Sequence, residues 1–293
     1  MMRILITGAT GQLGEELQRL LPSLGEVVAA GRELVDLEQP DRLPAVVQGL
    51  APDLIVNAAA YTAVDKAESD AERAELINAI APGVLAIAAR QLGIGLIHVS
   101  TDYVFDGSQS HPYQETDATH PLGVYGGSKL RGEVAVRNHC DHYCILRTAW
   151  VYGARGKGNF VKTMLRLGAE REEIRVVADQ VGSPTWSYHL ATAIAQLIPH
   201  FSRDLAGTYQ FTNSGVASWY DFAVAIFEEA AVLGFPLKLQ RVIPITTAEY
   251  PTPARRPAYS VLSCAKISAV LGTYPPHWRL GLRQMLQDLK APS

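Results

Sequence analysis

The stretch TGATGQLG, residues 7–14, decides the fold that this sequence predicts. It follows the short apolar run RILIT (3–7) and precedes leucines at helical spacing, so Gly8, Gly11 and Gly14 lie between a first strand and a first helix. Glycines there permit a tight turn and a close backbone approach, and a helix N-terminus attracts a diphosphate. The spacing is GxxGxxG rather than GxGxxG, but its position between strand and helix indicates dinucleotide binding.

Strand and helix patterns alternate through the first half of the chain. Buried strands are also predicted at 26–30, 53–60, 95–101 and 143–149, with helices near 41–50, over 68–92 with an interruption at Pro82–Gly83, and after Tyr125. Such alternation implies a parallel sheet with helices on both faces. The predicted fold class is therefore α/β, with a Rossmann-type doubly wound parallel sheet.

The second half of the chain is less regular. Helices are predicted near 159–170, 187–200, 218–234 and 279–290, with a long loop at 244–257. No clear linker separates the two halves. We therefore expect a dinucleotide-binding Rossmann domain over 1–150, to which later segments return, and a smaller interwoven α/β substrate lobe mainly over 151–293.

Composition excludes several classes of protein. The 293 residues carry 26 basic and 29 acidic side chains, a net charge of −3, which gives no bulk attraction to nucleic acid or to an anionic membrane. No apolar run approaches the ~20 residues of a membrane span, and no leader is recognisable at the N-terminus. Three cysteines fit a reducing compartment. We expect a cytoplasmic protein, with the cysteines packed as thiols.

The end of the second predicted strand favours one nicotinamide cofactor over the other. An acidic residue at this place binds the ribose of NAD, whereas an arginine accepts the extra phosphate of NADP. Here the strand ends in Gly31–Arg32, which favours NADPH and leaves NADH open. Asp36–Leu37 and Ala58–Thr62 are predicted walls of the adenine and nicotinamide clefts.

The segment PLGVYGGSKLRGE (121–133) places Tyr125 and Lys129 one helical turn apart, on one helix face. A nearby ammonium is expected to lower the pKa of a tyrosine, which suits a proton donor to a developing alkoxide. Ser100 and Thr101, at the end of the fourth strand, supply a group to position a carbonyl. Gly126 and Gly127 should each cost the helix about 1 kcal/mol relative to alanine.

Taken in order, these motifs resemble the extended short-chain dehydrogenase/reductase family. The resemblance covers nearly the whole chain. It is carried by VNAAAYTAVDKAE (56–68), STDYVFDG (100–107), VYGGSKLRGE (124–133), LRTAWVYG (146–153), NFVKTMLRL (159–167) and PTPARRP (251–257). It implies hydride transfer from NADPH to C4 of dTDP-4-dehydro-L-rhamnose, giving dTDP-L-rhamnose for cell-surface polysaccharide.

The resemblance also implies roles for single residues. Tyr125 protonates the substrate oxygen, Lys129 lowers the tyrosine pKa and binds the cofactor ribose, and Thr101 bonds near the carbonyl. The residues assigned to the cofactor are Gly8, Thr10, Gly11, Gln12, Leu13, Gly14, Arg32, Asp36, Leu37, Ala58, Ala60, Tyr61, Thr62, Val99, Tyr125 and Lys129. Those assigned to the dTDP-sugar are Thr101, Asp102, Trp150, Asn159, Phe160, Arg255 and Arg256, the two arginines as a clamp on its diphosphate.

Two differences from the sequence patterns of relatives bear on the type of reaction and on metal binding. Related dehydratases follow the threonine with Asp-Glu, but here Asp102 precedes Tyr103, which favours simple reduction. Some relatives form a magnesium-bridged dimer; Glu16 and Asp288 match two of the acidic positions, but SPTWSYHLA (183–191) has no acid. We therefore expect no structural metal, and a monomer or a homodimer.

Three alternatives stay open. They are another NADP-dependent sugar-nucleotide reductase or an epimerase, a redox-sensing NADP binder, and a non-catalytic regulatory subunit of methionine adenosyltransferase. Retention of Thr101, Tyr125 and Lys129 together with PTPARRP disfavours the regulatory subunit.

Overall fold

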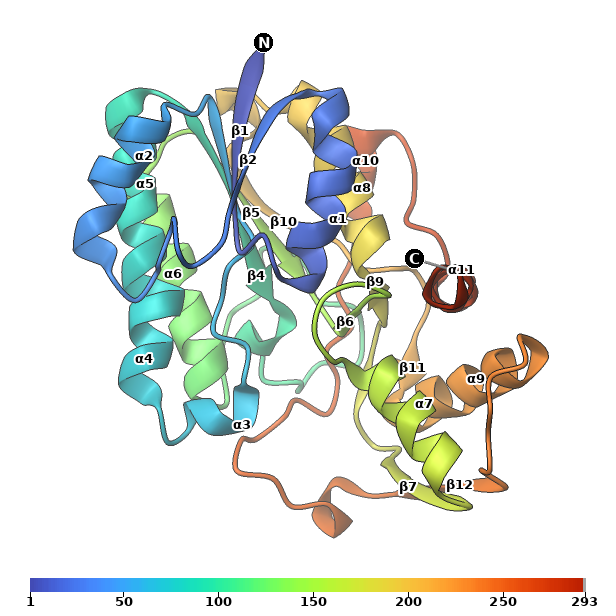
Figure 1. Cartoon of the computed structure of the whole chain (residues 1–293). Helices are drawn as coiled ribbons and strands as arrows, with labels where there is room; N and C mark the ends of the chain where they lie inside the picture. Colours follow the sequence, from blue (N-terminus) through green and yellow to red (C-terminus); the bar gives the residue numbers. More distant parts are fainter. Residues whose placement is uncertain (292–293) are drawn as a thin grey trace.

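A six-stranded parallel sheet forms the centre of the computed structural model, which describes residues 1–291 (Figure 1). Its strands are β1 (Met2–Thr7), β2 (Gly25–Ala30), β3 (Leu54–Asn57), β4 (Gly95–Thr101), β5 (Tyr143–Thr148) and β10 (Gly207–Gln210). They lie in the order β10-β5-β4-β3-β1-β2, so the chain crosses over between neighbours. The predicted doubly wound α/β sheet is confirmed.

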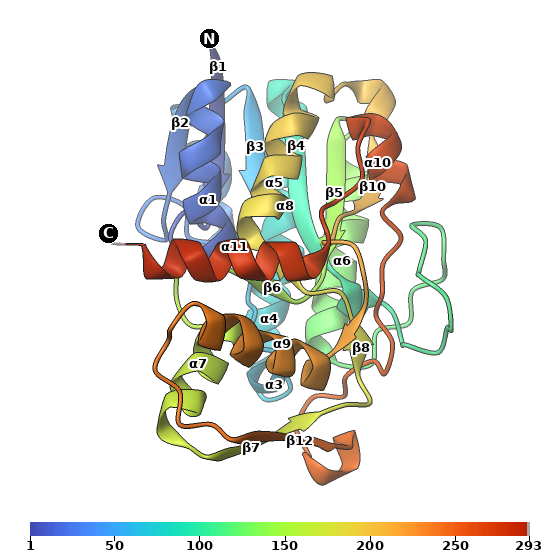
Figure 2. The same ribbon diagram turned by 90° about the vertical axis from the view of Figure 1, so that its right-hand side faces the viewer.

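Helices cover both faces of this sheet (Figures 1 and 2). One face is packed by α2 (Leu43–Leu50), α5 (Ala81–Leu92) and α6 (Val124–His139), and the other by α1 (Gln12–Leu20), α8 (Ser187–Leu197) and α10 (Ala265–Leu271). Successive strand residues point to opposite faces. Leu5 and Ile55 therefore pack under α5 and α6, whereas Ile4 and Val56 pack under α1 and α8.

The remaining elements form a second lobe below the carboxyl ends of the strands (Figure 2). It contains α7 (Phe160–Glu170), α9 (Trp219–Val232), α11 (Trp278–Lys290) and the strand pairs β7 (Glu173–Val177)/β12 (Arg241–Ile245), β8 (Val181–Gly182)/β11 (Ala217–Ser218) and β6 (Val151–Tyr152)/β9 (Thr185–Trp186). Phe222, Ile226 and Leu282 lie in its own apolar core. The second lobe therefore has an apolar core of its own, in addition to its contacts with the sheet domain.

The two halves are interleaved, because the chain leaves the sheet after β5 and comes back twice. First α8 and β10 return, and later α10 packs against both of them. β10 pairs with β5 in parallel register, Gly207 opposite Cys144. A single boundary at residue 150 stays a prediction.

Two predictions need correction, one about a helix and one about a strand. The predicted interruption at Pro82–Gly83 is wrong: α4 (Ala71–Glu75) continues through a π-helical turn (Leu76–Ile80) into α5. Proline lacks an N–H and clashes with the carbonyl four residues back, and the wide π turn just before it accommodates this. The strand predicted at 53–60 ends at Asn57, which leaves the following residues free to line a cavity.

Other segments were not predicted. The short strands of the second half were missed, including β10, because two to five residues carry too little pattern to identify. α3 (Val64–Ala67), one turn long, was missed as well. None of the helices described in residues 1–291 is both long and apolar enough to cross a membrane.

A buried ion pair joins α6 to β5. Arg147 on β5 donates two hydrogen bonds to Glu133 on α6, Nε–Oε1 2.9 Å and Nη2–Oε2 2.8 Å, and both side chains are almost inaccessible. The hydroxyl of Ser100 also donates to Glu133, at 2.6 Å. Arg137, one turn further along α6, adds a longer contact with Glu133, Nη1–Oε2 3.4 Å. These partners compensate the burial of the carboxylate, and removing Arg147 takes away the closer of the two cations.

We predict that Arg147→Met lowers the free energy of unfolding by about 3 kcal/mol, the lower end of the range for a broken buried pair, because Glu133 then keeps only its longer contact with Arg137. The matched control is Arg131→Met, since Arg131 makes the same bidentate contact with Glu75 but is about half exposed. Loss of such a surface pair should cost at most about 1 kcal/mol. Urea denaturation measures both, and equal losses would contradict the assignment.

Candidate active site

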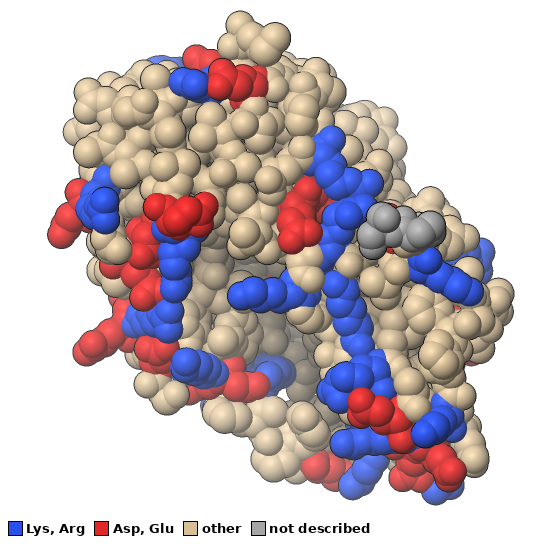
Figure 3. All heavy atoms as spheres, in the orientation of Figure 1, with Lys and Arg blue, Asp and Glu red and all other residues tan. Residues whose placement is uncertain are grey.

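A cavity of about 900 Å³ lies where the sheet domain meets the second lobe. Its walls come from the loop after β1, the segments after β2, β3, β4 and β5, the first two turns of α6, and residues 157–160 of the second lobe. Figure 3 shows the molecule hollowed between its two parts, with charged side chains along the rims. Parallel strands end at one edge of a sheet, so this is the place where such folds bind ligands.

The glycine loop is held by direct backbone packing. Gly8 has φ +71°, and a Cβ there would lie 2.8 Å from the backbone of Ala59. A Cβ on Gly14 would lie 2.1 Å from the carbonyl oxygen of Gly8. Gly11 caps α1 without a side-chain hydrogen bond, so the first N–H groups of the helix remain available to an anion. The loop fits a dinucleotide diphosphate.

Most of the residues assigned to the cofactor line the cavity. They are Gly8, Thr10, Gly11, Gln12, Leu13, Arg32, Asp36, Leu37, Ala58, Ala60, Thr62, Val99, Tyr125 and Lys129. Gly14 is packed behind the loop. The side chain of Tyr61 lies away from the cavity: it is buried, and its hydroxyl donates to Asp70 at 3.1 Å.

Arg32 lies at the rim of the cavity among acidic side chains. It is mostly exposed, pairs with Glu38, and has its Nε 3.7 Å from Asp36 Oδ1. Glu38 also accepts from Arg73 at 2.7 Å. Glu38 lines the cavity and was missed by the sequence analysis. Because Arg73 also pairs with Glu38, that carboxylate keeps a partner when Arg32 turns to another anion.

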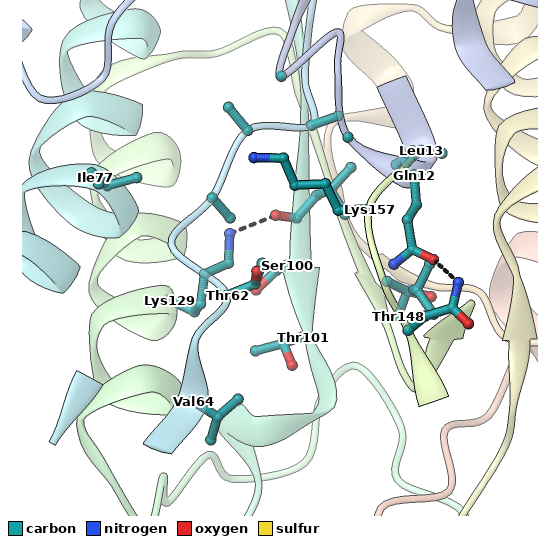
Figure 4. Close-up of a pocket in the computed structure, with 18 of the residues that line it drawn as sticks. Gln12, Leu13, Thr62, Val64, Ile77, Ser100, Thr101, Lys129, Thr148 and Lys157 are labelled. Atoms are coloured by element: carbon teal, nitrogen blue, oxygen red, sulfur yellow. Dashed lines mark hydrogen bonds between the residues drawn. The ribbon is translucent and has the colours of Figure 1, made fainter. Parts of the chain in front are cut away.

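Thr101, Tyr125 and Lys129 are brought together, as the sequence predicted they would be. Thr101 ends β4, its hydroxyl lies near the phenol of Tyr125, and it donates to Asp102 at 3.0 Å. Lys129 is buried, and its Nζ donates to the carbonyl of Val99 at 2.7 Å (Figure 4). A proton donor, a hydroxyl and an amine thus share one wall of the cavity.

The pKa of Tyr125 is raised in the structure, whereas its spacing from Lys129 had predicted that it would be lowered. Burial raises the pKa of Tyr125 to about 12, and the neighbouring hydroxyl of Thr101 only partly offsets this. Burial lowers the pKa of Lys129 to about 8, while the charge of Glu133 raises it. The expected lowering of the tyrosine pKa by Lys129 is not what this structure has, because the amine is turned to the Val99 carbonyl.

Asp102 is a second titratable group on this wall. Its side chain is 2% exposed, and burial raises its pKa to about 6 against the hydroxyls of Ser260 and Thr101, which lower it. Within residues 1–291 its Oδ2 has no hydrogen-bond partner. A half-satisfied buried acid beside a cavity is typical of a functional site.

A stacked aromatic pair forms the opposite wall. The rings of Trp150 and Trp219 lie 3.5 Å apart and 4° from parallel, and Phe160 packs against Trp219. Trp150 has φ +49° and fits over Gly182, where a Cβ would lie 2.6 Å from its ring. Trp219, 69 residues further along the chain, was missed because nothing in its local sequence connects it to Trp150.

Asn159 connects the two lobes. Its side-chain amide donates to Gln12 Oε1 and to the Gly153 carbonyl, both at 2.8 Å, and its oxygen accepts from the Lys162 N–H as the N-cap of α7. It lines the cavity with Phe160. The tie to Gln12 fixes the second lobe to the first residue of α1.

The predicted arginine clamp is not assembled. Arg256 is occupied by Asp65, with Nη2–Oδ2 2.7 Å and Nη1–Oδ1 3.0 Å, and this bond lowers the pKa of Asp65. Neither Arg255 nor Arg256 lines the cavity, although Arg255 is exposed. The planar fork that would have bound a diphosphate instead fastens the loop 251–257 to α3.

Lys157 reaches into the cavity from the loop before α7 (Figure 4). Sequence reasoning missed it, although the stretch GARGKG (153–158) offered a signal: a lysine among glycines beside a cleft. Gly156 has φ +71° and packs against the backbone of Gln12, so the loop lies across the N-terminus of α1.

The acids considered for a metal face arginines instead. Arg19 donates to Glu16 at 2.8 Å, and Arg155 lies 3.6 Å from Asp288. Among the residues that the structure describes, no cluster of three metal-ligating side chains occurs. The absence of a structural metal stays a prediction.

Comparisons with known proteins agree on one family. Residues 2–291 match the family described as the RmlD substrate binding domain. A dTDP-4-dehydrorhamnose reductase of Burkholderia thailandensis is 48% identical over 296 residues, 98% of this chain and 99% of the relative, and that of Escherichia coli K12 is 47% identical over 294 residues, 98% of each. The crystal structure of the Bacillus anthracis dTDP-4-dehydrorhamnose reductase in complex with NADP superimposes with a TM-score of 0.91 at 40% identity, covering 98% of this chain and 100% of that one.

We predict opposite effects for the two glycines of α6. A Cβ at Gly126 would lie 2.2 Å from the Tyr103 carbonyl, whereas one at Gly127 meets only the flexible end of Arg131 at 3.2 Å. Gly127→Ala should therefore stabilise the chain by up to about 1 kcal/mol, whereas Gly126→Ala should destabilise it and displace Tyr125. Thermal melting measures both, and a stabilised Gly126→Ala variant would disprove the packing argument.

Proposed function

The chain belongs to the dTDP-4-dehydrorhamnose reductase family, and on that basis we propose that it reduces dTDP-4-dehydro-L-rhamnose at C4 with NADPH, giving dTDP-L-rhamnose for polysaccharide biosynthesis. One observation supports this most directly. The glycine loop, the Thr101–Tyr125–Lys129 group and the paired tryptophans all face one cavity. We place the reaction in the cytoplasm, in keeping with the sparse cysteines.

The residues present fit NADPH. The glycine loop and the open N-terminus of α1 suit its diphosphate, and Arg32 at the end of β2 suits the additional phosphate on the adenosine ribose. Ala58, Thr62 and Val99 form the wall toward the catalytic group. When bound, NADPH supplies the hydride. The chain supplies orientation, exclusion of water, and the proton.

Tyr125 is the proton donor in this proposal. Because burial raises its pKa to about 12, its phenol keeps its proton at neutral pH and can give it to the C4 oxygen as negative charge develops there. The hydroxyl of Thr101, beside the phenol, orients it in this proposal. The ammonium of Lys129, on the same wall of the cavity, suits a hydroxyl of the cofactor ribose.

The second lobe holds the dTDP-sugar. The stacked pair Trp150–Trp219, with Phe160, offers a flat apolar wall to the sugar or to thymine. Lys157 brings a positive charge into the cavity for a diphosphate, the role that Arg255 and Arg256 had been expected to play. Asp102 and Asn159 supply polar groups for sugar hydroxyls.

We predict that Tyr125→Phe lowers turnover by about 10²–10⁴-fold, the usual contribution of a positioned acid, with NADPH binding unchanged. Loss of reduced-nicotinamide absorbance with dTDP-4-dehydro-L-rhamnose measures it, and Tyr274→Phe, at an exposed site, is the control. Full turnover by Tyr125→Phe would remove the proton-donor role. No turnover by the unaltered chain, with NADP still bound, would favour a non-catalytic NADP-binding subunit.

Arg32 is predicted to set the cofactor preference. Arg32→Ala should lower kcat/KM for NADPH by about 10–100-fold, the value of one charge-assisted hydrogen bond, and leave kcat/KM for NADH unchanged. Arg42→Ala serves as control, because the side chain of Arg42 is exposed and donates to Gln39 at 3.0 Å. An unchanged ratio of the two cofactors in the Arg32 variant would show that another residue reads the phosphate.

A further inference from the structure

A row of three polar side chains crosses the sheet beneath the cavity. Thr7, Asn57 and His98 lie on β1, β3 and β4, and each is fully buried. Thr7 is opposite Asn57 in register, and Asn57 is opposite His98, so the three side chains point to the same face. That face is the one that α5 and α6 cover, because Leu5, Ile55 and Leu96 share it.

Hydrogen bonds run along the row to the catalytic helix. The Thr7 hydroxyl donates to Asn57 Oδ1 at 2.6 Å, and Asn57 Nδ2 lies 3.0 Å from His98 Nδ1. His98 Nε2 lies 3.5 Å from the Nζ of Lys129, itself 2% exposed. The row therefore connects the residue before Gly8 with the amine of Lys129.

The direction of each bond fixes the position of the next proton. The Thr7 hydroxyl has one proton and gives it to the amide oxygen, so the amide of Asn57 presents N–H to His98 Nδ1. Burial and the charge of Lys129 hold the pKa of His98 well below its usual value, so the ring is neutral and carries one proton. With Nδ1 accepting, that proton is on Nε2 and faces Lys129.

This N–H distinguishes the two forms of the lysine. An ammonium has three donors and no lone pair, so it meets the N–H of His98 donor to donor. An amine can accept from Nε2–H and still donate to the Val99 carbonyl, which lies 2.7 Å from Nζ. The row therefore favours the amine form of Lys129.

We propose that Thr7, Asn57 and His98 are positioning residues for Lys129. Thr7 orients the amide of Asn57, and the amide keeps the ring proton of His98 on Nε2. The Nε2–H then donates a hydrogen bond to the lone pair of the Lys129 amine. The proposal rests on the proposed function only in taking Lys129 to be part of the reaction. It assigns a purpose to three buried polar groups that the catalytic group itself does not use.

Other charged groups act on Lys129 as well. Those packed around this part of α6 are Tyr125 and Glu133 on the helix, Arg147 on β5, and Asp102 and Tyr103 in the turn after β4. Glu133 raises the pKa of Lys129 but is itself neutralised by Arg147. Burial brings the pKa of Lys129 to about 8, so a change in one hydrogen bond alters its charge near neutrality.

Thr7→Val tests the row, because it removes the orienting hydroxyl and keeps the volume. The amide of Asn57 can then turn its oxygen to His98, the ring proton moves to Nδ1, and the free lone pair on Nε2 accepts from the ammonium. The pKa of Lys129 should rise by about 0.5–1 unit, the value of one hydrogen bond. Thr7→Ser keeps the hydroxyl and should behave like the unaltered chain.

The first measurement needs no cofactor. Nitrogen-15 NMR of the ligand-free chain reports the tautomer of His98, identified by the signal lost in His98→Asn. We expect the Nε2–H tautomer in the unaltered chain and in Thr7→Ser, and the Nδ1–H tautomer or a mixture in Thr7→Val. Thr212→Val, a buried hydroxyl near Cys264 and away from the cavity, is the control. An Nδ1–H ring in the unaltered chain overturns the proposal, even if Thr7→Val does not fold.

The second measurement is the pH dependence of kcat. In the proposed function the ammonium of Lys129 donates to the cofactor ribose, so turnover should fall as pH rises through the pKa of Lys129. By favouring the amine, the row sets where this fall begins, and Thr7→Val should shift it to higher pH by about 0.5–1 unit. Turnover with an unshifted fall in Thr7→Val overturns the row and leaves the proposed function intact. If the unaltered chain shows no turnover, the proposed function is contradicted. The NMR experiment then still tests the hydrogen-bonded row of Thr7, Asn57 and His98.

Discussion

The backbone of the glycine loop touches the backbone of the segment after β3, and the cavity depends on that contact. Side chains at Gly8 or Gly14 would overlap with backbone atoms at 2.8 Å or less. The contact brings the N-terminus of α1 to the carboxyl edge of the sheet, where β4 and α6 deliver Thr101, Tyr125 and Lys129. Because neither Gly8 nor Gly14 has room for a side chain, the loop can place the anion-binding N-terminus of α1 at the cavity.

Polar contacts, rather than an apolar stripe, attach α6 to the sheet. Lys129 bonds to Val99, Glu133 bonds to Arg147 and Ser100, and Gly132 packs so closely that a Cβ would lie 2.0 Å from the Asn78 carbonyl. A helix held by directional bonds has one allowed rotation about its axis. This explains why glycines that weaken it locally are tolerated: close approach lets its buried charges find partners.

The sequence was sufficient for those features that depend on local spacing. The glycine loop, the ends of β1, β2 and β4, and the helical turn between Tyr125 and Lys129 all follow from periodicity and backbone geometry. The sequence did not predict that Asp70 and Asp65 bind the side chains of Tyr61 and Arg256, because such partners are selected by packing between segments. Trp219 and Lys157 were missed for the same reason, and β10 because a four-residue strand is defined only by its neighbour.

The interleaved connectivity has a consequence for synthesis on the ribosome. β5 is complete at Thr148, but the strand that pairs with its outer side begins only at Gly207. While the intervening residues are being made, β5 presents a bare, apolar hydrogen-bonding edge, the kind of edge that recruits other strands. The nascent chain therefore passes through a stage in which the edge of its sheet is aggregation-prone, and at that stage the second lobe is still incomplete, because α9 and α11 follow β10 in the chain.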